Sequence, residues 1–227
     1  MNLLIVAATP FEVQPLRDYL GGQFAQVRDS RFVREELSVD MLITGAGMVQ
    51  TAYALGRVLA LSRYHLAINA GIAGAFDRSL RLGDVVQVVS ERLADLGVEE
   101  RNGRFTDVFE MGLIDPDQPP FLNGVIKAGH ASDFDFLPKC NGLTVNRVHG
   151  AEASIRAITE KYDAGVETME GAAFFYACSL SDVPFLQIRA ISNYVEPRNR
   201  SAWNLPLAIN NLNEVLIKIV QSLGIMN

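Results

Sequence analysis

The chain has 227 residues, of which 49% are hydrophobic, and its mean hydropathy is +0.14. This length and composition predict one compact domain, 1–227, with a sizeable core. The formal net charge of −6, without any long block of like charge, argues against nucleic acid or an anionic membrane as partner. We therefore expect a small-molecule ligand.

The two cysteines, Cys140 and Cys178, lack the spacing of metal ligands and predict no disulfide framework. Residues 1–8 form a strand-length apolar run that Thr9 and Pro10 end, without the basic residues of a signal peptide. No apolar run reaches the roughly 18 residues that a membrane-spanning helix needs. These observations predict a cytoplasmic protein. The sequence shows no metal-ligand cluster and no phosphate-binding loop, so we expect neither metal nor cofactor.

The first half of the chain alternates strands and helices. Residues 3–8 predict a buried strand, and residues 11–20 predict a helix that begins near Pro10 and is closed by Gly21 and Gly22. Three antiparallel strands, a helix, a further buried strand and a glycine-rich turn are expected next, at residues 24–27, 32–37, 39–44, 49–62, 65–69 and 70–75.

The second half continues this alternation. Residues 82–89 predict a strand, and residues 94–138 are turn-rich and predict a long irregular excursion of the kind that forms lids or subunit contacts. The remaining expected elements are strands at 142–147, 162–166 and 184–191 and helices at 151–161, 171–181 and 205–223. This order predicts a three-layer α/β/α sandwich around a mixed, mostly parallel twisted sheet.

Two carboxylates follow the carboxyl ends of predicted core strands, where open α/β sheets place their sites. Glu12 lies in the first turn of a predicted helix, where it either serves the helix dipole or acts as a general base. Glu170 precedes a helix of small and apolar residues, so its charge needs a partner or a ligand.

Arg189 is the only charge in the apolar run 183–191, which predicts that it is buried and paired with a carboxylate, either structurally or in a site. Asn193, after the same strand, either caps a turn or presents an amide that suits the N7 and O6 edge of a 6-oxopurine. His65, His130 and His149 lack metal spacing, and we expect structural or surface roles for them.

Five motifs, in order along nearly the whole chain, resemble those of the nucleoside phosphorylase and nucleosidase superfamily. They are Ala-Thr-Pro-Phe-Glu-Val (8–13), Asn-Ala-Gly-Ile-Ala-Gly-Ala (69–75), Leu-Gly-Asp-Val-Val (82–86), Met-Glu-Gly-Ala-Ala (169–173) and Arg-Ala-Ile-Ser-Asn (189–193). Within the superfamily, residues 192–200 most resemble the futalosine hydrolases, which release hypoxanthine from futalosine in menaquinone biosynthesis.

The resemblance implies roles for these residues. Glu12 matches the glutamate that activates the attacking water, and Arg189 matches the arginine beside it. Met169 and Glu170 match the pair that holds the ribose. Further substrate-binding residues are expected at Ala8, Gly74 and Arg147.

Three departures from the superfamily's patterns carry information. Asn193 stands where adenine-type nucleosidases carry an aspartate, which favours hypoxanthine over adenine. Asn69 and Ile72 stand where phosphorylases carry the arginine and serine that hold phosphate, which favours water as the nucleophile. Related hydrolases have a glutamate directly before the Met-Glu pair, where this chain has Thr168, with Glu167 one residue earlier.

Futalosine carries an aromatic carboxylate on its 5′ side, for which Arg147, Arg198, Arg200 and Trp203 are candidate contacts; each is equally compatible with a solvated loop. The resemblance also implies a homo-oligomer, a dimer or larger, with residues 105–114 as a candidate contact. The alternatives are a methylthioadenosine/S-adenosylhomocysteine-type nucleosidase, a purine nucleoside phosphorylase, and a non-catalytic nucleoside-binding protein.

Overall fold

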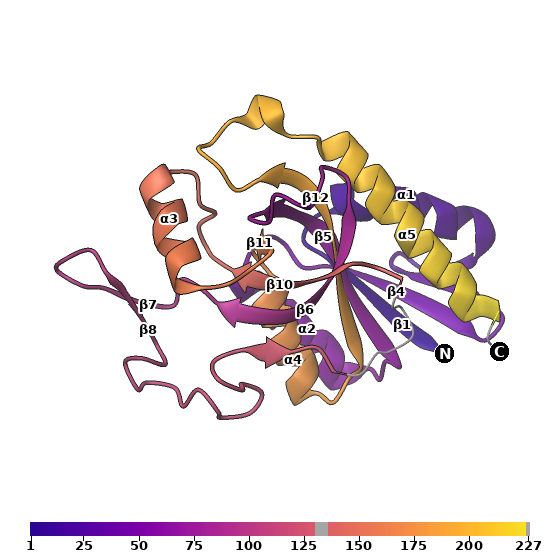
Figure 1. The fold of residues 1–227 in the computed structure, drawn as a ribbon. Coiled ribbons are helices and arrows are strands. Elements are labelled where there is room, and N and C mark those ends of the chain that lie inside the picture. The colour runs from indigo at the N-terminus through magenta and orange to yellow at the C-terminus, as the bar shows by residue number, and fades with distance from the viewer. Residues whose placement is uncertain (130–135, 226–227) are drawn as a thin grey trace.

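The computed structural model describes residues 1–129 and 136–225 and shows an α/β fold built on one large mixed sheet (Figure 1). The strands are β1 (Asn2–Ala7), β2 (Ala25–Arg28), β3 (Arg31–Arg34), β4 (Leu37–Ile43), β5 (Leu66–Ala75), β6 (Val85–Leu93), β7 (Gly97–Glu99), β8 (Phe105–Asp107), β9 (Ile126–Lys127), β10 (Lys139–Thr144), β11 (Val166–Thr168) and β12 (Phe185–Tyr194). The α-helices are α1 (Pro10–Gln23), α2 (Met48–Leu61), α3 (Glu152–Lys161), α4 (Gly171–Leu180) and α5 (Leu205–Ile225).

The large sheet has the strand order β11-β10-β6-β12-β5-β1-β4-β3-β2, with β9 beside β6. The central pairs β12–β5, β5–β1 and β1–β4 are parallel, whereas β6 runs antiparallel to β12 and β2, β3 and β4 form an antiparallel meander. β11 makes a second, antiparallel pairing with the end of β5. The predicted mixed, mostly parallel sheet is confirmed.

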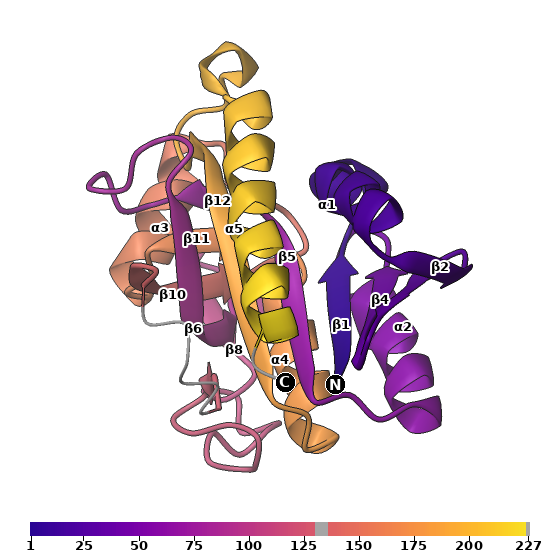
Figure 2. The ribbon, with the colours of Figure 1, turned by 90° about the vertical axis from the view of Figure 1, so that its right-hand side faces the viewer.

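Helices cover both faces of the sheet, as Figure 1 shows for α1 and α5 on one side and α2 and α4 on the other. The buried strand β1 reflects this, because its alternate residues enter different cores. Leu3 and Ile5 pack with α1 and α5, whereas Leu4 and Val6 pack with α2 and α4. In Figure 2, α5 runs along β12 and β5. The predicted three-layer sandwich is therefore confirmed.

β5 is longer than its neighbour β1, and this difference positions the site. The pairing of the two strands ends at Val6 and Asn69, whereas β5 continues to Ala75 beside β12. Where β1 stops, the chain turns into α1, so the first turn of this helix lies next to the uncovered part of β5 at Gly71.

The predicted glycine-rich turn at residues 70–75 is wrong, because these residues form the second half of β5. Its glycines are required by close contacts rather than by a turn. A Cβ on Gly71 would lie 2.7 Å from Arg189 Nη1, and a Cβ on Gly74 would lie 3.0 Å from Val195 Cγ2.

Several predicted boundaries also differ from the structure. Gly21 and Gly22 lie inside α1 rather than after it, and the strand expected at 162–166 is β11, which starts at Val166. β12 extends past the predicted end at 191 to Tyr194, so Asn193 lies within a strand. The strand expected at 82–89 starts at Val85 and runs to Leu93.

The described part of the excursion at 94–138 is irregular, as predicted, apart from the ribbon β7–β8 and the short β9. His130 lies outside the described residues. Among the residues that the structure describes, no helix is long and apolar enough to cross a membrane.

Candidate active site

Glu12 is held at the carboxyl end of β1 by the first turn of α1. Its Oε2 accepts hydrogen bonds from the backbone N–H and the hydroxyl of Thr9, both at 3.0 Å, and its Oε1 accepts from the N–H of Ile72 at 3.2 Å. The side chain is 8% exposed. Oε2 therefore closes the capping box of α1, while Oε1 points toward β5.

Arg189 lies beside Glu12 across the bare backbone of Gly71. A Cβ on this glycine would lie 2.7 Å from Arg189 Nη1 and 2.8 Å from Glu12 Oε1, so both side chains use the space that glycine leaves. Arg189 is 1% exposed, which confirms the predicted burial. Its Nε and Nη2 have no hydrogen-bond partner among the described residues. Buried donors in this state are rare, and they mark Arg189 as a candidate for binding water or substrate.

Glu170 completes a group of three charges. Its Oε2 lies 3.9 Å from Arg189 Nη2, and its Oε1 accepts a 2.9 Å hydrogen bond from the N–H of Gly47. Burial raises the pKa of the Glu170 carboxyl, Arg189 and the Gly47 N–H lower it, and the neighbouring Glu12 raises it further. The predicted pairing of Arg189 with a carboxylate is confirmed, at a distance that leaves room for a ligand atom.

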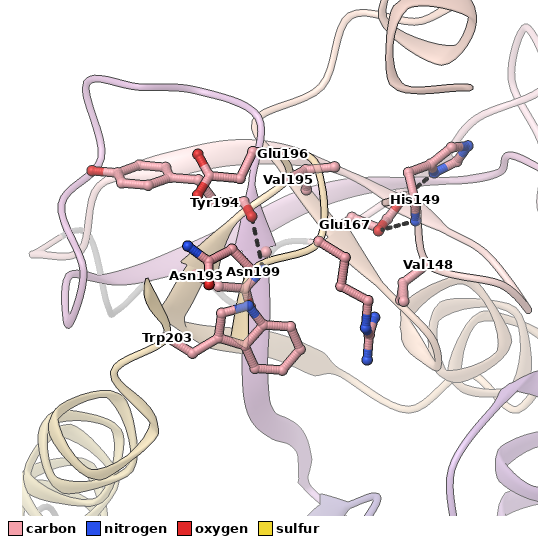
Figure 3. A pocket seen from close by; sticks show the side chains of 11 residues that line it. Val148, His149, Glu167, Asn193, Tyr194, Val195, Glu196, Asn199 and Trp203 are labelled. Carbon is pink, nitrogen blue, oxygen red and sulfur yellow. Dashed lines mark hydrogen bonds and ion pairs between the residues drawn. The ribbon is translucent and has the colours of Figure 1, made fainter. Parts of the chain in front are cut away.

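A cavity of about 60 Å³ lies at the ends of β5, β11 and β12 (Figure 3). This volume is smaller than that of a typical ligand pocket, and Glu12, Arg189 and Glu170 are not among the lining residues. Its lining residues are Gly74, Val148, His149, Glu167, Asn193, Tyr194, Val195, Glu196, Arg198, Asn199 and Trp203. Of the predicted site residues, Gly74, Asn193, Arg198 and Trp203 are among them.

Asn193, Gly74 and Glu167 form a row across three neighbouring strands. Gly74 pairs with Asn193 of β12 on one side and with Glu167 of β11 on the other. Paired residues place their side chains on the same face of a sheet. Because the central residue is glycine, the amide and the carboxylate flank a bare stretch of backbone, and Figure 3 shows them on different sides of the cavity.

The hydrogen bonds of Asn193 fix what its amide offers to a ligand. Oδ1 accepts from the Ser192 hydroxyl at 2.8 Å, and Nδ2 donates to the Tyr194 carbonyl at 2.9 Å. Nδ2 lies 3.1 Å from an ideal Cβ on Gly74 and carries a second hydrogen. The amide therefore presents a donor over Gly74 rather than capping a turn.

Sequence reasoning missed His149 as a site residue and left Glu167 without a role. Glu167 accepts hydrogen bonds from the backbone N–H of His149, at 3.0 Å, and pairs with its Nδ1. Both residues line the cavity. The available signal was the Val-Glu-Thr-Met-Glu sequence, in which a second glutamate stands three residues before Glu170.

The remaining predicted residues divide between the site and its surroundings. The carbonyl of Ala8 accepts from the N–H of Gly45 at 3.1 Å, which joins the turns after β1 and β4. Met169 is half-buried directly before Glu170. Arg147 is exposed and is not among the cavity-lining residues.

Two arginine side chains lie over the ring of Trp203. Arg198 lies 5.4 Å and Arg200 6.0 Å from the ring centroid, and Arg198 also lines the cavity. This edge of the cavity is therefore basic and aromatic, and its contact with a 5′ carboxylate stays a prediction. No cluster of metal-binding side chains occurs among the described residues.

Comparison with known proteins identifies the family of the chain. The profile of the phosphorylase superfamily matches residues 2–221. The chain belongs to this superfamily. Phosphorylase superfamily relatives include a futalosine hydrolase from Acidothermus cellulolyticus, which is 32% identical over 92% of this chain and 86% of its own length.

A 5′-methylthioadenosine/S-adenosylhomocysteine nucleosidase from Haemophilus ducreyi is 28% identical over 81% of this chain and 80% of its own length. The solved structure of futalosine hydrolase from Helicobacter pylori superposes with a TM-score of 0.79 at 13% identity, covering 98% of each chain. At this identity the likeness shows the fold alone.

Proposed function

We propose that this protein hydrolyses the N-glycosidic bond of futalosine and releases hypoxanthine. We also propose that residues 1–227 form a single domain. The observation that carries the proposal is the row Asn193–Gly74–Glu167. A 6-oxopurine presents N7 and O6 as acceptors and N1–H as a donor along one edge. The free Nδ2 hydrogen of Asn193 suits N7 and O6, and the carboxylate of Glu167 suits N1–H.

Adenine fits this row less well. Its 6-amino group and the Asn193 Nδ2 are both donors, and its unprotonated N1 faces the Glu167 carboxylate as a second acceptor. Buried polar groups without partners cost free energy, so such mismatches discriminate strongly. The alternative of a methylthioadenosine-type nucleosidase is therefore less favoured.

In the proposed mechanism, Glu12 takes a proton from water as this attacks the anomeric carbon. Arg189, whose Nη1 lies beside Glu12 over Gly71, orients the same water. Glu170 accepts hydrogen bonds from ribose hydroxyls with Met169 beneath the ring, and Asn193 stabilises the negative charge that develops on the departing base. The transition state has oxocarbenium character.

Water is favoured over phosphate as the nucleophile because of the charges in the site. Arg189 faces two carboxylates, Glu12 and Glu170, so a phosphate dianion would meet more negative than positive charge. At the places where phosphorylases carry an arginine and a serine, Asn69 is buried and Ile72 donates its N–H to Glu12.

One assay tests the function directly: release of free base from futalosine, from its 6-amino analogue and from inosine, each with and without phosphate. We expect hypoxanthine release from futalosine to be fastest and independent of phosphate. A strict phosphate requirement would identify a phosphorylase, and no base release from any nucleoside would leave the non-catalytic binding protein as the better interpretation.

A change of Asn193 to Asp tests base recognition. The carboxylate accepts from a 6-amino group and, when protonated, can donate to N7, so the ratio of kcat/KM for futalosine to that for its 6-amino analogue should fall by about tenfold or more. The control is Glu196→Gln, which removes the charge of a different side chain lining the same cavity. It should keep the wild-type ratio of kcat/KM for the two substrates. An unchanged ratio in Asn193→Asp would remove Asn193 from base recognition.

We further propose a homo-oligomer. Its support is an exposed apolar surface on two neighbouring helices, with Val49 and Tyr53 one turn apart on α2 and Tyr176 and Leu180 one turn apart on α4. Light scattering of the purified protein measures the oligomeric state, and a mass of one chain at assay concentration contradicts it.

A further inference from the structure

Glu91 is a buried carboxylate that the mechanism above does not use. It lies on β6 with 0% exposure and accepts three hydrogen bonds. Thr144 Oγ1 donates at 2.8 Å, Gln187 Nε2 at 2.6 Å and Thr168 Oγ1 at 3.3 Å. Three donors converging on one carboxylate satisfy its ionised form, because a protonated carboxyl would turn a fourth donor toward them.

The same two threonines hold the start of α4. The first N–H groups of a helix have no partner inside the helix. In α4 the N–H of Ala172 donates to Thr144 Oγ1 at 2.7 Å, and the N–H of Gly171 donates to Thr168 Oγ1 at 3.3 Å. Each hydroxyl therefore accepts from the helix and donates to Glu91, which places a negative charge behind the helix N-terminus.

This arrangement frees the carboxylate of Glu170. Glu170 is the N-cap residue of α4, yet its side chain makes no capping hydrogen bond and turns instead to Gly47 and Arg189. An N-cap side chain normally accepts from the first helical N–H groups. Here Thr144, Thr168 and Glu91 take over that task.

The packing around Glu91 leaves little freedom for this geometry. A Cβ on Gly171 would lie 1.9 Å from Glu91 Oε1, and a Cβ on Gly142 would lie 2.5 Å from it. The carboxylate thus lies directly under the first residue of α4, and the helix start cannot shift toward β6 without displacing it.

We propose that Glu91 is a positioning residue that fixes the orientation of Glu170, and hence of the ribose, through Thr144 and Thr168. In this arrangement, ionised Glu91 holds all three donors and the N-terminus of α4 keeps its register. Protonated Glu91 loses at least one donor, and the turn that carries Met169 and Glu170 loosens.

The buried position of Glu91 allows it to change protonation near neutral pH. Burial raises the pKa of Glu91 to about 7, while the hydrogen bonds and Arg189 on β12 lower it. Glu170, at the start of α4, is a second buried carboxyl with a raised pKa, and the thiol of Cys140 on β10 has its pKa raised by burial and by Glu91. The residues that face Glu91 from β11 and β9 are Thr168 and Ile126.

The variant Glu91→Gln tests the proposal. An amide keeps the size of the side chain, but its NH₂ group replaces one carboxylate oxygen and opposes at least one of the three donors. We expect KM for futalosine at pH 8 to rise by about tenfold with a smaller change in kcat, because ribose binding is lost similarly in the ground and transition states. The wild-type KM should rise as the pH falls through about 7, and the part of this rise due to Glu91 should disappear in the variant.

Stability gives a readout that does not depend on catalysis. The folded-state pKa of Glu91, about 7, lies above the usual carboxyl value, so its contribution to stability is fully present at low pH and is lost as the pH rises through about 7. Between pH 5 and pH 8, the Tm of Glu91→Gln should therefore rise relative to the Tm of the wild type. Glu160→Gln, on the exposed face of α3, is the control and should show neither effect.

A second pair of variants guards against misfolding of Glu91→Gln. Thr144→Val removes one hydroxyl while leaving Glu91 in place, and Thr144→Ser keeps the hydroxyl. We expect KM to rise in the valine variant and to be restored by serine. This inference rests on the proposed function for its kinetic readout. Absence of hydrolysis by wild type would overturn the function alone, whereas a pH-independent Tm difference together with an unchanged KM would overturn the role of Glu91.

Discussion

Replacing Glu12 by Gln is expected to lower kcat for futalosine by a factor on the order of a hundred or more, as the loss of a general base typically does. Glutamine retains an acceptor for the Thr9 N–H, so α1 should start at the same residue. It has no basic oxygen to take a proton from water. Substrate binding should be largely kept, because the proposed ribose and base contacts lie on Glu170, Asn193 and Glu167.

The measurement is steady-state kinetics with a thermal melt of the same preparation. Asp18→Asn, on the exposed face of the same helix, is the matched control and should behave as wild type. Near-normal kcat in Glu12→Gln would exclude Glu12 as the base and would leave its role as helix capping alone.

Gly71→Ala is expected to reduce kcat/KM by about a hundredfold while leaving the fold intact, since small misplacements of catalytic groups have effects of this size. The new methyl group would lie 2.7 Å from Arg189 Nη1 and 2.8 Å from Glu12 Oε1. Both atoms are the ends of flexible side chains, so they can move away while β5 keeps its pairing with β12. Glu12, the proposed general base, and the neighbouring Arg189 are then displaced together.

Gly56→Ala provides the matched glycine control, because a Cβ on Gly56 in α2 meets no atom within 4 Å. We expect unchanged activity and a small gain in stability, up to about 1 kcal/mol, as for alanine replacing glycine in a helix. Wild-type kcat/KM in Gly71→Ala, with its Tm also unchanged, would show that the space over Gly71 is not needed for catalysis.

The sequence predicted the layered fold and the charged half of the site because both depend on local patterns. Arg189 stands alone in an apolar strand, and such a charge has to find a partner. Glu12 follows a buried strand and a Thr-Pro pair, which indicates the start of a helix at the sheet edge.

The proposed base-binding half depends on contacts that no local pattern records. Glu167 reaches Gly74 through the antiparallel pairing of β11 with β5. A strand of three residues has too little sequence pattern for its pairing partner to be predicted. The glycines of β5 were predicted as a turn because glycine is ambiguous between turns and close contacts. Glu91 follows Ser90 and precedes Arg92, so its sequence context indicates a solvated strand end rather than a buried network.

The double pairing of the end of β5 also has a kinetic consequence. Gly74 meets Asn193 and Glu167 only after β12 and β11 have both joined the sheet, and both come from the last third of the chain. Pairings between distant parts of a chain form slowly, because loop closure costs entropy before the contacts compensate it. The proposed base pocket should therefore be among the last parts of the protein to form during refolding. If hypoxanthine binds only the completed sheet, as proposed, it should slow unfolding without accelerating folding.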